Sequence, residues 1–124
     1  MPHLNLTITM FNQRKYSEAA RQAAEGLATA QGRDEAFWMG VMETCEGFAF
    51  LQGDDMLQAE RTLVAAMEKL RNFGFRYNDF EVTTCLAGTR RCVEEIRLTR
   101  QYEHKIFDVS LLPQMRMASQ AEIA

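Results

Sequence analysis

Two glutamates, Glu43 and Glu46, have the residue type and spacing that come closest to a chemical site in this sequence. Three residues apart on one helix, their carboxylates would face similar directions. Paired carboxylates can bind a metal or transfer protons, but metal sites in helical bundles normally add a Glu-x-x-His motif from a second helix. The sequence has no such motif. We therefore predict no catalytic residues and keep both glutamates as candidate ligand-binding residues, with an edge of the bundle or an arginine partner as the structural alternative.

The aromatic segment 73–80 is the second candidate. Four of its eight residues are aromatic, and an arginine lies among them. Aromatic rings beside a cation can line a ligand pocket or a partner groove. The structural alternative is a hydrophobic plug between two helices. The candidate binding residues here are Phe75, Arg76 and Tyr77.

Histidine and cysteine residues do not have the spacing of a metal site. His3 and His104 stand near opposite ends of the sequence, and the three cysteines form no C-x-x-C pair. A zinc site needs ligands grouped more closely. The sequence also lacks a P-loop, a G-x-G-x-x-G and a G-x-S-x-G motif. We predict neither metal nor cofactor, and reduced core thiols of the kind found in cytosolic proteins.

Composition indicates one globular domain. The chain has 124 residues, 47% of them hydrophobic, and a net charge of −3. This charge argues against a nucleic-acid partner, because such domains are usually basic. There is no window of 18 apolar residues and no secretory signal at the first residues, which argues against a membrane partner. The predicted location is the cytoplasm.

Glycines and capping residues divide the chain into helices. Gly32, Gly53 and Gly74 each follow an apolar-periodic stretch, as expected at a helix C-terminus. Asp34 and Asp79 stand where helix N-caps are expected. The fold class predicted is all-α, a small bundle of about five antiparallel helices. The predicted ranges are 4–12, 17–31, 34–52, 55–72 and 79–102.

The third predicted helix is apolar nearly all round, which favours a central position. Beyond residue 104 the helical periodicity is lost, but apolar side chains continue to residue 112. We therefore predict a domain over residues 1–112 with an extended C-terminal tail laid on the bundle, and fraying over residues 113–124. The core where the third and fourth helices cross is predicted to hold Trp38, Val41, Cys45, Phe48, Leu63 and Met67.

An internal similarity has an offset of 40 residues. The stretch that begins at Tyr16 aligns with the stretch that begins at Met56, and a polar turn precedes each. A polar turn followed by a small residue is typical of tetratricopeptide-like helix-turn-helix pairs. Antiparallel helix packing alone would give the same pattern, and both explanations stay open at this point.

The segments Phe11-Asn12-x-x-x-Tyr16-x-Glu18-Ala19 and Phe37-Trp38-Met39-Gly40-Val41-Met42 resemble the bacterial and archaeal family known as domain of unknown function 309. The resemblance covers about residues 8–75 and implies a small all-α fold related to tetratricopeptide pairs. Ala20 and Phe50 stand where that family has histidines. No catalytic or metal role is therefore carried over to this chain.

Two functions remain. The first is a non-enzymatic scaffold that binds a protein or peptide partner or self-associates, with a homodimer formed through the tail or the aromatic segment. The alternative is a small-molecule-binding protein or enzyme with a pocket inside the bundle that uses Glu43, Glu46, Arg76 and Tyr77. Convergent charged groups in a closed pocket would favour the alternative, whereas an open apolar groove would favour the scaffold.

Overall fold

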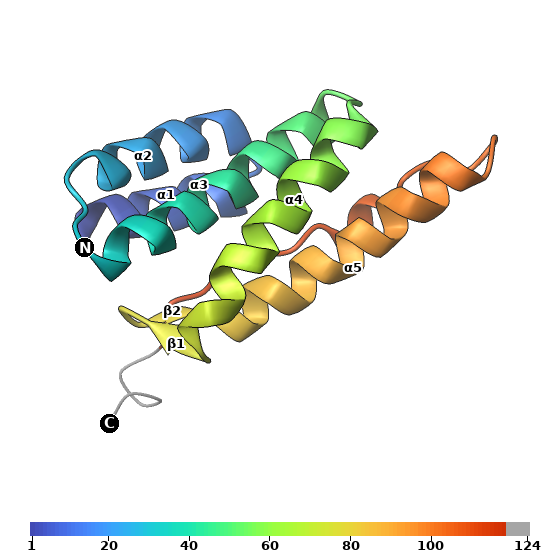
Figure 1. Ribbon diagram of the computed structural model, residues 1–124. Helices are drawn as coiled ribbons and strands as arrows, with labels where there is room; N and C mark the ends of the chain where they lie inside the picture. The colour runs from blue at the N-terminus through green and yellow to red at the C-terminus, as the bar shows by residue number, and fades with distance from the viewer. Residues whose placement is uncertain (119–124) are drawn as a thin grey trace.

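The computed structural model describes residues 1–118, and in it the chain forms five α-helices joined by short connections (Figure 1). Every helix end lies within three residues of its predicted position, and the all-α class is confirmed. The helices are α1 (Pro2–Asn12), α2 (Tyr16–Ala28), α3 (Arg33–Gln52), α4 (Met56–Leu70) and α5 (Val82–Gln101).

Helix α3 lies at the centre, between α2 and α4, while α1 packs on α2 and α5 on α4. Glycines let the backbones of α3 and α4 approach each other. A Cβ added at Gly47 would lie 2.4 Å from Leu63 Cδ2, and one added at Gly40 would lie 2.7 Å from Leu70 Cδ2. Any larger residue there would force the two helices apart.

The predicted crossing of α3 and α4 holds five of the six expected core residues. Trp38, Val41, Cys45, Phe48 and Leu63 are buried. Met67 is only partly buried, so its place in the core was predicted wrongly. Helix α4 turns Ala59, Leu63, Ala66 and Leu70 inward. The small residue Ala66 is fully buried, whereas the longer Met67 packs against the core and stays partly exposed.

The aromatic segment forms a short hairpin of β1 (Arg76–Tyr77) and β2 (Phe80–Glu81), preceded by the 3-10 turn η1 (Arg71–Phe73). Asn78 and Asp79 at its turn both have positive φ, of 50° and 65°, as a two-residue type I′ turn requires. The rings of Phe73, Tyr77 and Phe80 surround Phe37 of α3, with centroids 4.8 to 5.7 Å away. Most of the segment is thus a hydrophobic plug.

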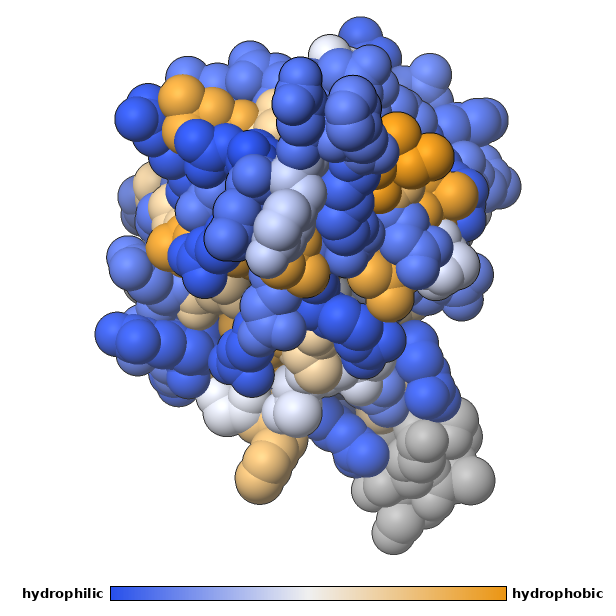
Figure 2. Space-filling view, turned by 90° about the vertical axis from the view of Figure 1, so that its right-hand side faces the viewer, coloured by the Kyte–Doolittle hydropathy of each residue, from blue (hydrophilic) through white to orange (hydrophobic). Residues whose placement is uncertain are grey.

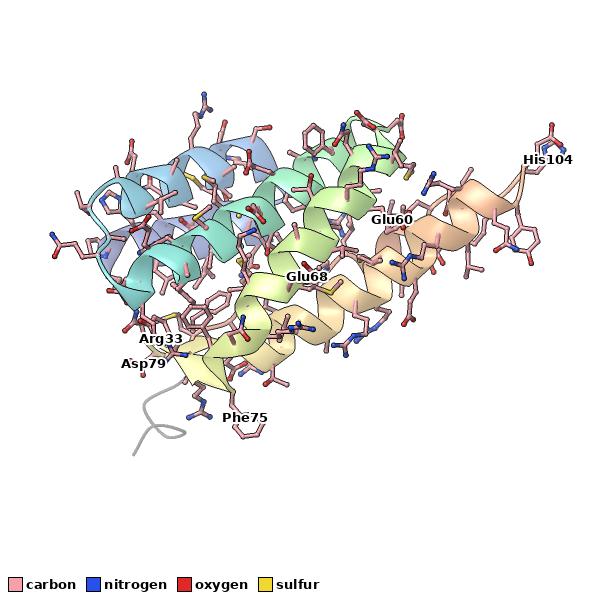
Figure 3. All side chains as sticks on the ribbon, viewed as in Figure 1. Arg33, Glu60, Glu68, Phe75, Asp79 and His104 are labelled. Carbon is pink, nitrogen blue, oxygen red and sulfur yellow. The ribbon has the colours of Figure 1, made fainter. Side chains whose placement is uncertain are left out.

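Helix α5 is tied to both α4 and the tail. Glu60 of α4, labelled in Figure 3, accepts hydrogen bonds from Arg97 Nε at 3.0 Å and Arg100 Nη1 at 2.6 Å. On the tail side, Glu95 accepts from Lys105 Nζ and from the backbone N–H of Asp108, the latter at 2.9 Å. These contacts hold the C-terminal half of α5, which extends beyond the other helices (Figure 1).

The tail turns back at the end of α5 and runs towards the hairpin (Figure 1). It includes the 3-10 turn η2 (Val109–Leu111), and Phe80 of β2 pairs with Met117. Pro113 packs on Gly88 of α5, and Met115 is buried. The structure therefore differs from the predicted fraying over residues 113–118, because packed side chains continue well past residue 112. The rest of the predicted frayed segment, 119–124, lies outside the described residues.

Candidate binding groove

Two helix connections of this chain have the same geometry. Arg14, before α2, and Asp54, before α4, both have a φ of 62°. In the first connection Arg14 N donates to Phe11 O, and in the second Asp54 N donates to Leu51 O at the corresponding place. The backbone N–H of the following residue donates to the carbonyl five residues back in both connections, from Lys15 to Met10 and from Asp55 to Phe50. The similarity at an offset of 40 residues is therefore a repeat of one turn structure.

The two turns lie against each other. Gln52, at the end of α3, donates its side-chain amide to the carbonyl of Arg14 at 3.1 Å. This bond joins the second turn to the first and places Arg14 and Asp54 on one side of the bundle. The repeat thus brings a cation and an anion at equivalent positions to a common surface.

A groove of about 540 Å³ separates these two turns from the tail. We call it the tail groove. Its volume is in the range of sites that hold one small ligand or a few side chains. The residues lining it are Arg14, Tyr16, Phe48, Leu51, Gln52, Asp54, Met56, Thr99, Lys105, Ile106, Phe107, Val109 and Leu112.

The tail side of the groove exposes apolar side chains to solvent. Ile106 is 85% exposed and Val109 is 60% exposed. Figure 2, which faces the end of the molecule towards which α5 runs, shows several hydrophobic patches interrupted by hydrophilic residues. Exposed apolar groups that border a concave surface are typical of binding sites.

Tyr16 is the most informative residue of the groove lining. Its side chain is 2% exposed and packs between Phe11 and Phe48, with ring centroids 5.1 and 5.6 Å away. Its hydroxyl oxygen is buried, and nothing in residues 1–118 hydrogen-bonds to it. Burial raises the pKa of this hydroxyl above its usual value, with the Arg14 charge acting in the opposite direction. The hydroxyl is thus a protonated donor without an acceptor.

The charged residues of the groove differ in their partners. Lys105 is held by Glu95, as described above. Arg14 makes no ion pair with any residue in the described part of the chain. Its guanidinium is therefore the cation of the groove that remains available to a ligand.

The predicted pair Glu43 and Glu46 lies away from the groove lining. Glu43 forms an ion pair with Lys69 of α4 at 2.9 Å. Glu46 borders a shallow depression with Ser17, Ala20 and Phe50. Burial raises the pKa of Glu46, and the nearby charge of Glu43 adds to the rise. The two glutamates therefore have different surroundings, although they share a helix.

The other predicted binding residues lie at the hairpin. Tyr77 donates from its hydroxyl to Asp34 at 2.5 Å, and Arg33 lies over the rings of Phe73 and Tyr77. Phe75 is 82% exposed and projects away from the ribbon in Figure 3. Arg76 lies beside it, on β1. None of Glu43, Glu46, Phe75, Arg76 and Tyr77 lines the tail groove, so the structure does not bring the predicted residues together there.

Sequence reasoning missed the groove residues Arg14, Tyr16, Asp54 and Lys105. One signal was available for the first three, because the repeat at an offset of 40 residues places them on two turns. The position of Lys105 depends on how the tail folds back, and helical periodicity carries no information on that.

Residues 1–118 contain neither a metal-binding cluster nor a membrane-spanning helix. No group of three or more His, Cys, Asp or Glu residues there is placed to hold a metal ion. No helix over the same residues is long and apolar enough to cross a bilayer. Burial raises the pKa of the thiols of Cys85 and Cys92 to about 12, which makes both poor nucleophiles at neutral pH.

No family model matches the chain, and no curated protein and no solved structure is significantly similar to it. The resemblance to domain of unknown function 309 therefore stays a prediction.

Proposed function

We propose that this protein is a non-enzymatic binding module that holds an apolar segment of a protein or peptide partner in the tail groove. The observation that carries the proposal is the exposure of Ile106 and Val109 beside a half-open groove with apolar walls. Monomeric proteins seldom leave apolar groups in such an arrangement without a binding role. The three buried, unpaired cysteines suit a reducing compartment, and we place the module in the cytoplasm.

Self-association is the version of this proposal in which the partner is a second copy of the chain. A two-fold homodimer would cover Ile106 and Val109 of both copies at once. The photocrosslinking experiment described below identifies this case, because the crosslinked product then has twice the mass of the chain.

The small-molecule alternative with Glu43, Glu46, Arg76 and Tyr77 has less support. Lys69 already pairs with Glu43, and Asp34 already accepts from Tyr77. Groups with satisfied partners inside the chain gain less from a ligand than an unpaired group does.

Site-directed photocrosslinking in cells of the source organism tests the proposal. A photoreactive phenylalanine replaces Val109 in one variant and Phe75, a more exposed residue at the hairpin, in the control. We expect a discrete adduct from position 109 that disappears when Ile106→Asp is added, and no such adduct from position 75. Adducts of equal yield from both positions, or none from position 109, would contradict the proposal.

A further inference from the structure

We infer that the partner of the tail groove is a second copy of this chain, and that Arg14 of each copy pairs with Asp54 of the other across a two-fold axis. The inference rests on the proposed function and names the partner that the groove selects. It is carried by two unpaired, opposite charges that the fold places on the lining of the groove.

Over the described residues, the lining of the tail groove carries three charged side chains, which are Arg14, Asp54 and Lys105. Lys105 is held by Glu95. Arg14 and Asp54 are both exposed, and neither forms an ion pair with any residue in the range 1–118. The groove therefore offers a partner one cation and one anion, whose charges sum to zero.

The repeated turn holds these two charges at a fixed spacing. Arg14 and Asp54 occupy equivalent positions of the two turns, each with a φ of 62°. The side-chain amide of Gln52 ties the second turn to the carbonyl of Arg14. Groups that are already fixed relative to each other lose less freedom on binding than groups on independent loops. A partner that pairs with both must carry an anion and a cation at a matching spacing.

A second copy of the chain meets this requirement by symmetry. In a two-fold dimer every contact between two different residues occurs twice, so a contact from Arg14 to Asp54 is accompanied by the reverse contact. The dimer then contains two such ion pairs, and all four charges face an opposite charge. A partner with one predominant charge would instead place a like charge against Arg14 or Asp54, which opposes binding.

Ile106 and Val109 supply the apolar part of the same surface. They are 85% and 60% exposed, and they line the groove together with Arg14 and Asp54. A second copy that covers these side chains removes them from water, which favours association. Exposed ion pairs add little affinity by themselves. The apolar side chains therefore provide most of the affinity, and the two charges set the orientation of the copies.

Charge exchange between the two turns tests the inference on the full chain. The single variants are Arg14→Asp and Asp54→Arg, and a double variant carries both changes. Each single change gives one turn the residue that the equivalent turn already has at the same φ, so the variants should fold, and circular dichroism checks this. Sedimentation equilibrium from micromolar to millimolar concentrations measures the dissociation constant of the dimer.

Two controls change the net charge by the same amounts elsewhere. Lys15→Asp matches Arg14→Asp, and Glu94→Arg matches Asp54→Arg. Both control positions are exposed and lie outside the groove lining. An effect of net charge alone would therefore appear in the controls as well.

We expect the parent chain to sediment with twice the mass of the chain. Each single variant places like charges in both ion pairs of the dimer and should weaken it at least about tenfold. The double variant, and an equimolar mixture of the two single variants, should regain the affinity of the parent, because both restore two pairs of opposite charges. The two controls should dimerise as the parent does.

Three results would overturn the inference: a parent chain that stays monomeric at every concentration, single variants that dimerise as tightly as the parent, or a mixture that associates no better than its components. The proposed function fails separately, if position 109 gives no photocrosslink in cells. A monomeric parent chain with a discrete adduct of a different protein at position 109 would keep the binding module and exclude the second copy as its partner.

Discussion

The side chain of Asn12 forms two hydrogen bonds with the backbone of Met115, although 103 residues separate them. Its Oδ1 accepts from Met115 N at 2.8 Å, and its Nδ2 donates to Met115 O at 3.0 Å. The end of α1 and the tail are thus joined by a side chain that mimics a paired strand.

Asn12→Ala should lower the free energy of unfolding by about 1–3 kcal/mol, because it leaves both backbone groups of Met115 without these partners. Urea denaturation monitored by circular dichroism measures the change. Asn5→Ala, at an exposed position of the same helix, is the control and should have a much smaller effect. A loss at Asn12 no larger than at Asn5 would show that the tail is not held there.

Gly47→Ala should destabilise the fold by about 1–3 kcal/mol, because its new Cβ would lie 2.4 Å from Leu63 Cδ2 and overpack the α3–α4 crossing. The matched control is Gly53→Ala, whose Cβ would meet only backbone oxygens at 3.6 Å or more. The difference between the two midpoints in chemical denaturation is the informative quantity. Equal midpoints would contradict the close approach of α3 and α4 at Gly47.

Phe48→Ala should cost roughly 3–5 kcal/mol of stability, since Phe48 is fully buried and packs on Phe11 and Tyr16. Met67→Ala should cost about 2 kcal/mol or less, because Met67 is only partly buried. Thermal and urea unfolding of both variants would rank them. A larger loss for Met67 would place that residue, and not Ala66, in the core.

The ion pair of Glu95 predicts a pH dependence of stability. The hydrogen bond from Lys105, and then that from the Asp108 N–H, lower the pKa of Glu95 below its usual value. A depressed folded-state pKa stabilises the fold above the unfolded pKa of about 4.3, and this contribution is lost as the pH falls through the folded-state pKa.

Glu95→Gln should therefore destabilise the protein most at neutral pH, and the difference from the parent should shrink as the pH falls below about 4. Unfolding free energies measured from pH 7 to pH 3 give this difference. Glu94→Gln, on the exposed side of the same helix, should give a small and nearly constant difference. A constant difference for Glu95→Gln would count against the ion pair.

The helices were predictable because local signals specify them. Gly32 and Gly74 have positive φ at the ends of apolar-periodic stretches, as glycine allows without strain. Gly53 also ends a helix, but with a φ of −87°, and the positive φ falls on Asp54 instead. The end of α3 was therefore predicted correctly, but the residue with positive φ is Asp54 and not the predicted Gly53.

The groove was not predictable from the same signals. Tyr16 was visible as part of a repeat, but its missing hydrogen-bond partner is a property of the assembled fold. The tail contributes one side of the groove through contacts such as Asn12 with Met115, which no local periodicity encodes. Glu43 and Glu46 were chosen for their spacing, and spacing alone did not reveal that Lys69 pairs with Glu43.

The bonds between Asn12 and Met115 have a consequence for synthesis on the ribosome. Helices α1 to α4 make contacts between neighbours in sequence, which form early and fast. The partner of Asn12 is made about 100 residues later, and closing so long a loop is slow. Until residue 115 of the nascent chain has emerged, the surface of α1 that contacts the tail in the folded protein is therefore left uncovered. During this interval the apolar side chains of that surface are exposed to chaperones and to other nascent chains.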